Sequence, residues 1–177
     1  MRKFRTVFMR GGTSKGCLFH KSDLPADRAE WDEIFLQVMG CPDPKQIDGM
    51  GGTVSSNNKI VVIWKSEQPD VDIEYLVGQV IVGKRQVDYK SNCGNMTAAV
   101  PAFAVEEGLV DIVEPITTVR ISAAASAAGA GTSAAGNPSA AKEISLPSSA
   151  QQITVSVSLS KKTRSSVSLP PSVPNWL

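Results

Sequence analysis

The residue whose surroundings most favour chemistry is Cys93, which lies between polar residues and a glycine, just before an apolar stretch with the pattern of a helix. A thiol at a helix N-terminus is close to unpaired backbone N–H groups, which stabilise its thiolate, and a thiolate can carry a proton. Gly94 would let a ligand approach the backbone, and Asn95 can donate a hydrogen bond, so the same place can bind a substrate carboxylate. Packing is the alternative interpretation, because most cysteines are small buried apolar residues.

Lys59 is the second candidate, and it ends a polar, glycine-rich loop, "GGTVSSNNK", that runs directly into a β-branched strand. A lysine at the mouth of a buried strand loses hydration, which favours the neutral amine that can act as a base. The alternative is a solvated lysine at a strand end. The loop "RGGTSKG" (10–16) can form an anion-binding nest, but it lacks the spacing of a Walker A loop, so no nucleotide is implied.

The other titratable residues do not form a catalytic or metal-binding pattern. His20 is the only histidine, and a lone histidine after an apolar strand is more often a surface or core residue than a ligand, so it receives no role. Asp70, Asp72 and Glu74 alternate on a predicted strand, as they would on a solvated face. The sequence therefore predicts no metal site and no Ser/His/Asp triad.

The composition favours a small-molecule partner. The 18 basic and 17 acidic residues nearly cancel, so no overall field attracts the chain to nucleic acid or to an anionic membrane. Three cysteines without a CxxC pair indicate a reducing compartment. No stretch approaches the length of a membrane span, and no apolar segment follows the basic N-terminus as in a signal peptide. These features predict a soluble, cytoplasmic protein, with an organelle as the alternative location.

Short strands and two helices must position Lys59 and Cys93. Strands on either side of "RGGTSKG" predict a hairpin, and the next helix has apolar residues at helical spacing with Gly40 as its stop. The predicted elements are strands at 6–9 and 17–20, a helix within 25–40, strands at 59–64, 72–82 and 85–89, and a helix at 96–107. Pro101 should bend the last helix or move its start. This order of elements predicts an α+β fold.

The composition changes after Ile121, where the chain becomes rich in Ala, Ser, Gly and Pro. We therefore expect one globular domain in residues 1–121 and a disordered tail in residues 122–177, since the tail offers few large side chains to bury. Alternating apolar residues from Ile153 to Leu159 predict one strand within the tail.

Four blocks in a fixed order resemble a known family: "MRGGTSKG", "MGCPDPKQIDGMGG", the polar loop ending in Lys59, and "CGNMTAAVPAFAVEEGLV". Together they closely resemble the PrpF family, almost continuously over residues 1–121. Members of this family isomerise 2-methylaconitate, and relatives act on aconitate-like or oxalomesaconate-like acids. The resemblance implies a diaminopimelate-epimerase-like fold, in which two similar α+β domains each wrap a sheet around a central helix and enclose the active site between them.

The resemblance also implies site residues and a mechanism without a cofactor. The family's proposed catalytic lysine and cysteine match Lys59 and Cys93, with the roles of base and acid left open. The positions expected to bind the substrate's carboxylates are Ser14, Ser55, Ser56, Asn57, Gly94 and Asn95. A base would remove an allylic proton from an unsaturated tricarboxylic acid, and backbone N–H donors would stabilise the resulting carbanion.

The chain departs from the family pattern in three places. Asn57 and Asn58 occupy positions where the family usually has serine or threonine and then serine, and "VPAFA" replaces "VGPFA". After "TTVRI" the family continues into a second domain, whereas this chain enters the Ala/Ser-rich tail. A shifted reading frame, an unspliced intron or a genuine truncation would each produce this break. The first domain would then expose an apolar face that the second normally covers, which would favour self-association.

Two functions are therefore carried forward. The first is a cofactor-independent isomerase of a small unsaturated polycarboxylic acid, such as 2-methylaconitate, aconitate or a related acid of the alkylcitrate pathway. The second is a truncated or degenerate relative that is inactive or serves as an interaction module.

Overall fold

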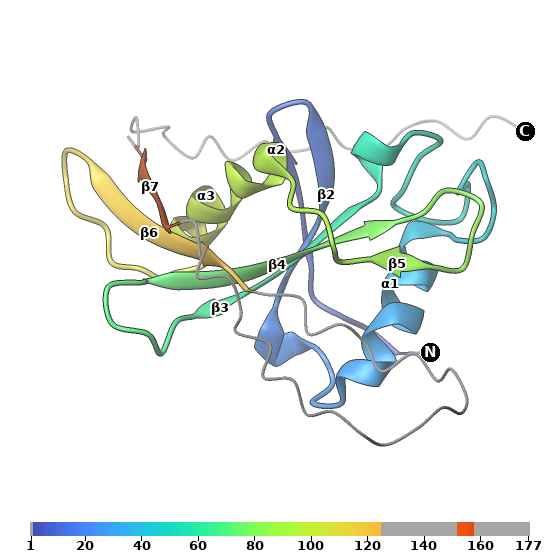
Figure 1. Cartoon of the computed structure of the whole chain (residues 1–177), viewed down its shortest axis with the longest axis horizontal. Helices are drawn as coiled ribbons and strands as arrows, with labels where there is room; N and C mark the ends of the chain where they lie inside the picture. Colours follow the sequence, from blue (N-terminus) through green and yellow to red (C-terminus); the bar gives the residue numbers. More distant parts are fainter. Residues whose placement is uncertain (1, 125–151, 158–177) are drawn as a thin grey trace, which may run out of the picture.

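A computed structural model of the chain describes residues 2–124 and the backbone of residues 152–157. It contains one seven-stranded mixed sheet with helices on both faces (Figure 1), so the predicted α+β class is confirmed. The strands are β1 (Val7–Gly11), β2 (Ser14–His20), β3 (Lys59–Lys65), β4 (Ile73–Val80), β5 (Val87–Asp88), β6 (Thr117–Ala123) and β7 (Gln152–Val157). The α-helices are α1 (Trp31–Met39), α2 (Gly94–Thr97) and α3 (Ala99–Glu106), and the 3-10 turns are η1 (Lys21–Asp23), η2 (Arg28–Glu30) and η3 (Ser55–Asn57).

The strand order is β1-β2-β3-β4-β6-β7, with β5 paired to β4. Antiparallel pairs join strands that follow each other directly, as in the β1–β2 hairpin, whose turn contains Gly12 at φ +54. The pairs β2–β3 and β4–β6 are parallel. Parallel strands need a crossover connection, and α1 lies in the first connection while α2 and α3 lie in the second. All strands expected within residues 1–121 are present.

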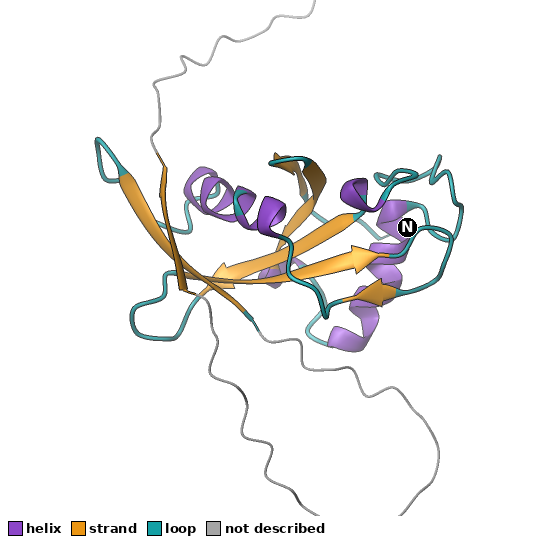
Figure 2. Ribbon diagram, turned by 45° about the horizontal axis from the view of Figure 1, so that its top comes forward, coloured by secondary structure: helices purple, strands orange, loops and turns teal. Residues whose placement is uncertain are grey.

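Each face of the sheet has its own apolar core, because successive side chains of a strand point to opposite faces. Ile60 of β3 packs with Phe35 of α1 on one face. Its neighbour Val61 packs with Phe103 of α3 on the other face. Figure 2 shows α2 and α3 lying over this second face, where α3 contacts both β1 and β6. The face of a β3 residue therefore follows from whether its number is odd or even.

Helix α1 matches the expectation for residues 25–40. A 3-10 turn precedes it, and the side chain of Asp27 caps that turn by accepting a hydrogen bond from the backbone N–H of Ala29 at 2.9 Å. Trp31 begins the α-helix, and Gly40 ends it at φ +79, a left-handed conformation that favours glycine.

The second predicted helix is divided into α2 and α3 at Ala98, and it begins at Gly94, two residues earlier than expected. Pro101 explains the division. It has no N–H to donate to the carbonyl of Thr97, and its ring would collide with that carbonyl in a continuous helix. The expectation that Pro101 bends the helix or moves its start is confirmed.

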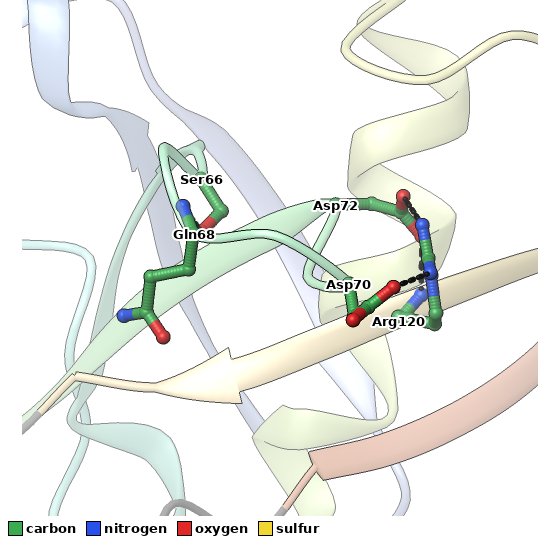
Figure 3. Close-up of polar contacts among 5 residues, drawn as sticks. All are labelled: Ser66, Gln68, Asp70, Asp72 and Arg120. Carbon is green, nitrogen blue, oxygen red and sulfur yellow. Dashed lines mark hydrogen bonds and ion pairs between the residues drawn. The ribbon is translucent and has the colours of Figure 1, made fainter.

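A charged cluster fastens β6 to the turn that precedes β4 (Figure 3). Arg120 of β6 donates from Nη2 to Asp72 Oδ1 at 2.9 Å and from Nε to Asp72 Oδ2 at 3.2 Å. Asp70 Oδ1 accepts a longer contact of 3.4 Å. The hydrogen bonds from Arg120 lower the pKa of Asp72. Asp70 and Asp72 thus lie before the strand, which begins at Ile73, and Asp72 holds β6 in place instead of belonging to a purely solvated face.

This cluster should make the stability of the fold depend on acid pH. Because the pKa of Asp72 is lowered in the folded state, the ionised pair stabilises the fold above the ordinary aspartate pKa of about 3.9, and this contribution is lost as the pH falls. We expect Asp72→Asn to lower the free energy of unfolding at neutral pH and to flatten its decrease toward about pH 3. Urea denaturation at several pH values measures both effects. Asp70→Asn is the control and should change the free energy of unfolding little, since the Asp70 side chain is 82% exposed. If the stability of Asp72→Asn depended on pH as that of the wild type does, the stabilising role of the Asp72–Arg120 pair would be contradicted.

The strand expected within the tail is present as β7, which pairs antiparallel with β6. It is confirmed as far as Val157, and Leu159 lies outside the described residues. The division into a domain of residues 1–121 and a tail of residues 122–177 stays a prediction, because most of the tail is not described. In the part of the chain that is described, no helix is long and apolar enough to cross a membrane.

Candidate active site

Cys93 is the N-cap residue of α2, as its sequence position predicts. It is half-buried and packs against the core beneath α3. Its backbone N–H donates to Asn92 Oδ1 at 2.8 Å, and its carbonyl accepts from the N–H of Thr97 at 2.9 Å and from the hydroxyl of Thr97 at 3.1 Å. The backbone on both sides of the thiol is therefore fixed, while the residue as a whole is only partly buried.

The other two cysteines are in different surroundings. Cys17 is fully buried in the core beneath α1, and burial raises its pKa to about 11. Cys41 is also buried, and its Sγ donates to the carbonyl of Lys84 at 2.7 Å. Burial raises the pKa of the Cys41 thiol as well. The packing interpretation fits these two cysteines better than it fits Cys93.

The thiol of Cys93 faces the end of the β1–β2 hairpin. Its Sγ lies 3.9 Å from the hydroxyl of Ser14, a residue that is only 3% exposed. The side chain of Asn95 donates to Thr13 Oγ1 at 2.9 Å and to Ser14 Oγ at 3.4 Å. The start of α2 is therefore joined to the hairpin by side chains from both segments.

Two glycines of "RGGTSKG" permit this close approach. A Cβ on Gly11 would lie 2.1 Å from the carbonyl oxygen of Asn95, and one on Gly12 would lie 2.3 Å from Asn95 Oδ1. Both distances are far below a normal contact, and Gly12 also has a positive φ. The glycines expected to form a tight turn thus have a second purpose, which is to admit Asn95.

Lys59 begins β3 and lies beside Gly16 of β2 and Gln79 of β4 in the register of the sheet. Val61 points to the face covered by α3, so Lys59, two residues earlier, points to the same face. The amine of Lys59 donates a hydrogen bond to Gln79 Oε1, and the side chain is half-buried. The lysine is thus held within the sheet and is not a freely solvated strand end.

Strand β2 connects the cysteine to the lysine. Ser14 contacts Cys93, and Gly16, two residues further along the same strand, is the register partner of Lys59. Both β2 residues point to the face covered by α3, because Leu18 of the same strand does so. Lys59 and Cys93, which are 34 positions apart in the sequence, therefore belong to the same face of the sheet.

The predicted binding residues form two groups. Ser14, Gly94 and Asn95 lie at Cys93, as described above. Ser55, Ser56 and Asn57 form η3, which contacts β2 and immediately precedes the buried Asn58 and then Lys59. Asn58 holds this loop by donating to the carbonyl of Val54 at 2.8 Å. Within residues 2–124, no hydrogen bond joins the η3 side chains to Cys93, so this group belongs to the lysine side.

Three residues near the site were not singled out from the sequence. Thr13 bonds to Asn95, and Gln79 bonds to Lys59. Thr97 shares a hydrogen bond of 3.0 Å with the buried hydroxyl of Tyr75 behind Cys93. Only Gln79 carried a signal in the sequence, since it is a polar residue inside the apolar run "YLVGQVIV". The contacts of Thr13 and Thr97 depend on distant segments.

Two further features lie away from this group of residues. His20 is at the opposite end of β2 from Ser14, and its Nε2 lies 3.1 Å from Glu107 Oε2. A hollow of about 360 Å³ lies between the N-terminal segment and α1, and none of the predicted site residues lines it. Among the described residues there is no group of three or more His, Cys, Asp or Glu side chains that could hold a metal ion.

Comparisons with known proteins identify several similar sequences. A (4E)-oxalomesaconate Delta-isomerase from Novosphingobium sp. (strain KA1) is 53% identical over 104 residues, which are 59% of this chain and 29% of that protein. A 2-methyl-aconitate isomerase from Shewanella oneidensis is 46% identical over 129 residues, covering 67% of this chain and 32% of that protein. The chain thus spans about a third of the length of these relatives.

A solved structure and a family model agree with these similarities. The crystal structure of a methylitaconate-delta-isomerase superposes with a TM-score of 0.66 at 42% identity, covering 68% of this chain and 31% of that chain. The model of the family described as "PrpF protein" matches residues 1–131. Since that match extends over well more than half of the 177 residues, the chain belongs to the PrpF family.

Proposed function

We propose that this chain carries the lysine and cysteine of an isomerase that acts on a small unsaturated polycarboxylic acid by proton transfer without a cofactor. The observation that carries the proposal is that Lys59 and Cys93 point to one face of the sheet and are connected through Ser14 and Gly16 of β2. The substrate class is supported by the similar proteins, whose names specify isomerases of oxalomesaconate, 2-methyl-aconitate and methylitaconate.

The proposed reaction removes one proton from the substrate and returns another, so the composition of the substrate is unchanged. One of Lys59 and Cys93 removes an allylic proton from the substrate, and the other returns a proton at the far end of the allylic system or at the same carbon after rotation. The carbanion between these steps is stabilised by the substrate's own carboxylates. The hydroxyl of Ser14 and the N–H groups of Gly94 and Asn95 lie beside Cys93 and are the donors proposed to stabilise this charge.

The remaining substrate contacts are assigned to η3. Its residues Ser55, Ser56 and Asn57 offer hydroxyl and amide groups next to Lys59 and are proposed to bind a second carboxylate. The diaminopimelate-epimerase-like fold and the cytoplasmic location belong to the same proposal. The fold is supported by α3 contacting both β1 and β6, as expected when a sheet wraps around a helix. Self-association stays a prediction.

Isotope exchange tests the proposed function directly. The purified full chain is incubated with trans-aconitate or 2-methylaconitate in deuterium oxide, and the allylic protons are followed by NMR. We expect the protein to catalyse incorporation of deuterium at the allylic position, because proton removal must precede movement of the double bond. If well-folded protein gives no exchange with either acid, the proposal fails for these substrates, and the alternative of a non-catalytic relative is favoured.

A further inference from the structure

The side chain of Gln79 is buried in β4 with its amide orientation determined by hydrogen bonds. It is 8% exposed. Its Nε2 donates to the carbonyl of Asn58 at 3.2 Å and to the carbonyl of the neighbouring Val80 at 2.9 Å. An amide nitrogen has two protons and cannot accept. Because both protons are directed to carbonyls, Oε1 is the atom that faces Lys59, and it accepts the hydrogen bond from Nζ.

This arrangement gives a flexible side chain a fixed direction. Lysine has a four-carbon stem with many rotamers. Among the described residues, Gln79 is the one hydrogen-bond partner of the Lys59 amine. Gln79 lies directly across from Lys59 in the register of β3 and β4, so the two side chains share the face on which Cys93 lies. The amide therefore determines where the amine of Lys59 is held.

The neutrality of this acceptor matters for proton transfer. A carboxylate beside an amine stabilises the ammonium form, which cannot act as a base. On the other side of Gln79, its register partner in β5 is Asp88, whose Oδ1 accepts from the N–H of Lys90 at 2.9 Å. Neighbouring strands are about 4.8 Å apart, so Gln79 stands between the amine and this carboxylate. Among the described residues, Cys93 and the buried hydroxyl of Tyr75 are the other titratable groups on this face near the site.

We propose that Gln79 is a positioning residue that holds the amine of Lys59 in place and supplies it with an acceptor that carries no charge. The inference rests on the proposed function, and it takes Lys59 to be the member of the pair that removes the proton from the substrate. Gln79 itself does not contact the substrate in this scheme. It acts through the bond to Lys59 alone.

Two substitutions of similar size separate its charge from its hydrogen bond. Gln79→Glu keeps an acceptor but adds a carboxylate, and Gln79→Met keeps the length but removes the acceptor. Both variants lose the N–H bonds to the carbonyls of Asn58 and Val80, so this loss is common to the two. For Gln79→Glu we expect isotope exchange at neutral pH to fall by about tenfold or more, with activity recovering as the pH is raised. For Gln79→Met we expect a lower kcat with little change in KM and no displacement of the pH profile. If Gln79 only stabilised the fold, the pH profile of isotope exchange would not shift in Gln79→Glu while staying unchanged in Gln79→Met.

A measurement independent of activity keeps the test separate from the proposed function. Competitive acetylation with a trace of acetic anhydride, read by mass spectrometry, reports how much of each lysine is in the neutral form. We expect Gln79→Glu to lower the labelling of Lys59 at mildly alkaline pH by about tenfold. Lys65, at the exposed end of the same strand, is the internal control and should be unchanged in each variant.

The two failures are distinguishable. If the wild-type chain gives no isotope exchange but labelling of Lys59 responds to Gln79→Glu, the proposed function is wrong and the coupling between Gln79 and Lys59 stands. If exchange occurs and neither its pH profile nor the labelling of Lys59 responds to Gln79→Glu, the positioning role of Gln79 is overturned.

Discussion

Replacing Lys59 with alanine, or Cys93 with serine, is expected to lower the rate of deuterium exchange by at least about a hundredfold. A positioned general acid or base typically contributes about 10² to 10⁴ in rate, and each substitution removes one of the two proposed proton carriers. Cys93→Ser keeps the shape of the residue but replaces the thiol with a hydroxyl, which is a far weaker acid. The measurement is the exchange of trans-aconitate or 2-methylaconitate in deuterium oxide, followed by NMR for each variant.

Matched controls come from the same strand and the same residue type. Lys65→Ala removes an exposed lysine at the other end of β3, and Cys41→Ser changes a cysteine whose Sγ bonds to the carbonyl of Lys84, an interaction that a hydroxyl can also make. Both controls should keep wild-type exchange rates. Exchange that survives in folded Lys59→Ala and Cys93→Ser would remove these residues from the mechanism.

Gly16→Ala is expected to lower the free energy of unfolding by about 2–3 kcal/mol, as overpacking of a closely packed site does. A Cβ on Gly16 would lie 2.0 Å from the carbonyl oxygen of Lys59 and 2.8 Å from its Cβ. The first of these atoms is backbone and cannot rotate away, so β2 and β3 would have to separate where the sheet holds Lys59. Urea denaturation followed by circular dichroism measures the loss.

Gly94→Ala is the control for this stability measurement. A Cβ on Gly94 would have no heavy atom within 4 Å, so the free energy of unfolding should stay within about 0.5 kcal/mol of the wild type. The same variant bears on the proposed site, because the added methyl group would occupy the space through which a ligand approaches the backbone beside Cys93. An equal loss of stability in Gly16→Ala and Gly94→Ala would show that the contact with Lys59 is not the cause.

The two predictions concern the same part of the sheet. Gly16 admits Lys59 by lacking a side chain, and Gly11 and Gly12 admit Asn95 for the same reason. Glycines thus allow two close contacts along the β1–β2 hairpin. One is with Lys59, and the other is with Asn95 at the start of α2. The hairpin is thus the segment that contacts both Asn95 and Lys59.

Local elements could be predicted from the sequence because their causes are local. The hairpin around "RGGTSKG", the stop of α1 at Gly40 and the buried strand from Lys59 each depend on residues within a few positions of one another. The position of Cys93 at a helix N-terminus was predicted for the same reason. The start of that helix was missed by two residues, since it begins at Gly94 and not at Met96.

The pairing that builds the site could not be predicted from local patterns. The parallel register that sets Gly16 beside Lys59 forms across the connection containing α1, and the bond from Asn95 to Thr13 joins residues 82 positions apart. The contact of Gln79 with Lys59 likewise depends on the register of β3 against β4. Family resemblance pointed to Lys59 and Cys93, but it did not indicate which neighbours hold them.

By itself the sequence predicted the helices and the strands other than β6, the α+β class, the family and the two residues proposed to carry the proton. Only the tertiary structure decided that Lys59 and Cys93 share a face, that Ser14 and Gly16 connect them, and that Gln79 holds the lysine. The physical reason is that periodicity and turn chemistry act over a few residues, whereas strand register is decided by the burial of whole faces against α1 and α3.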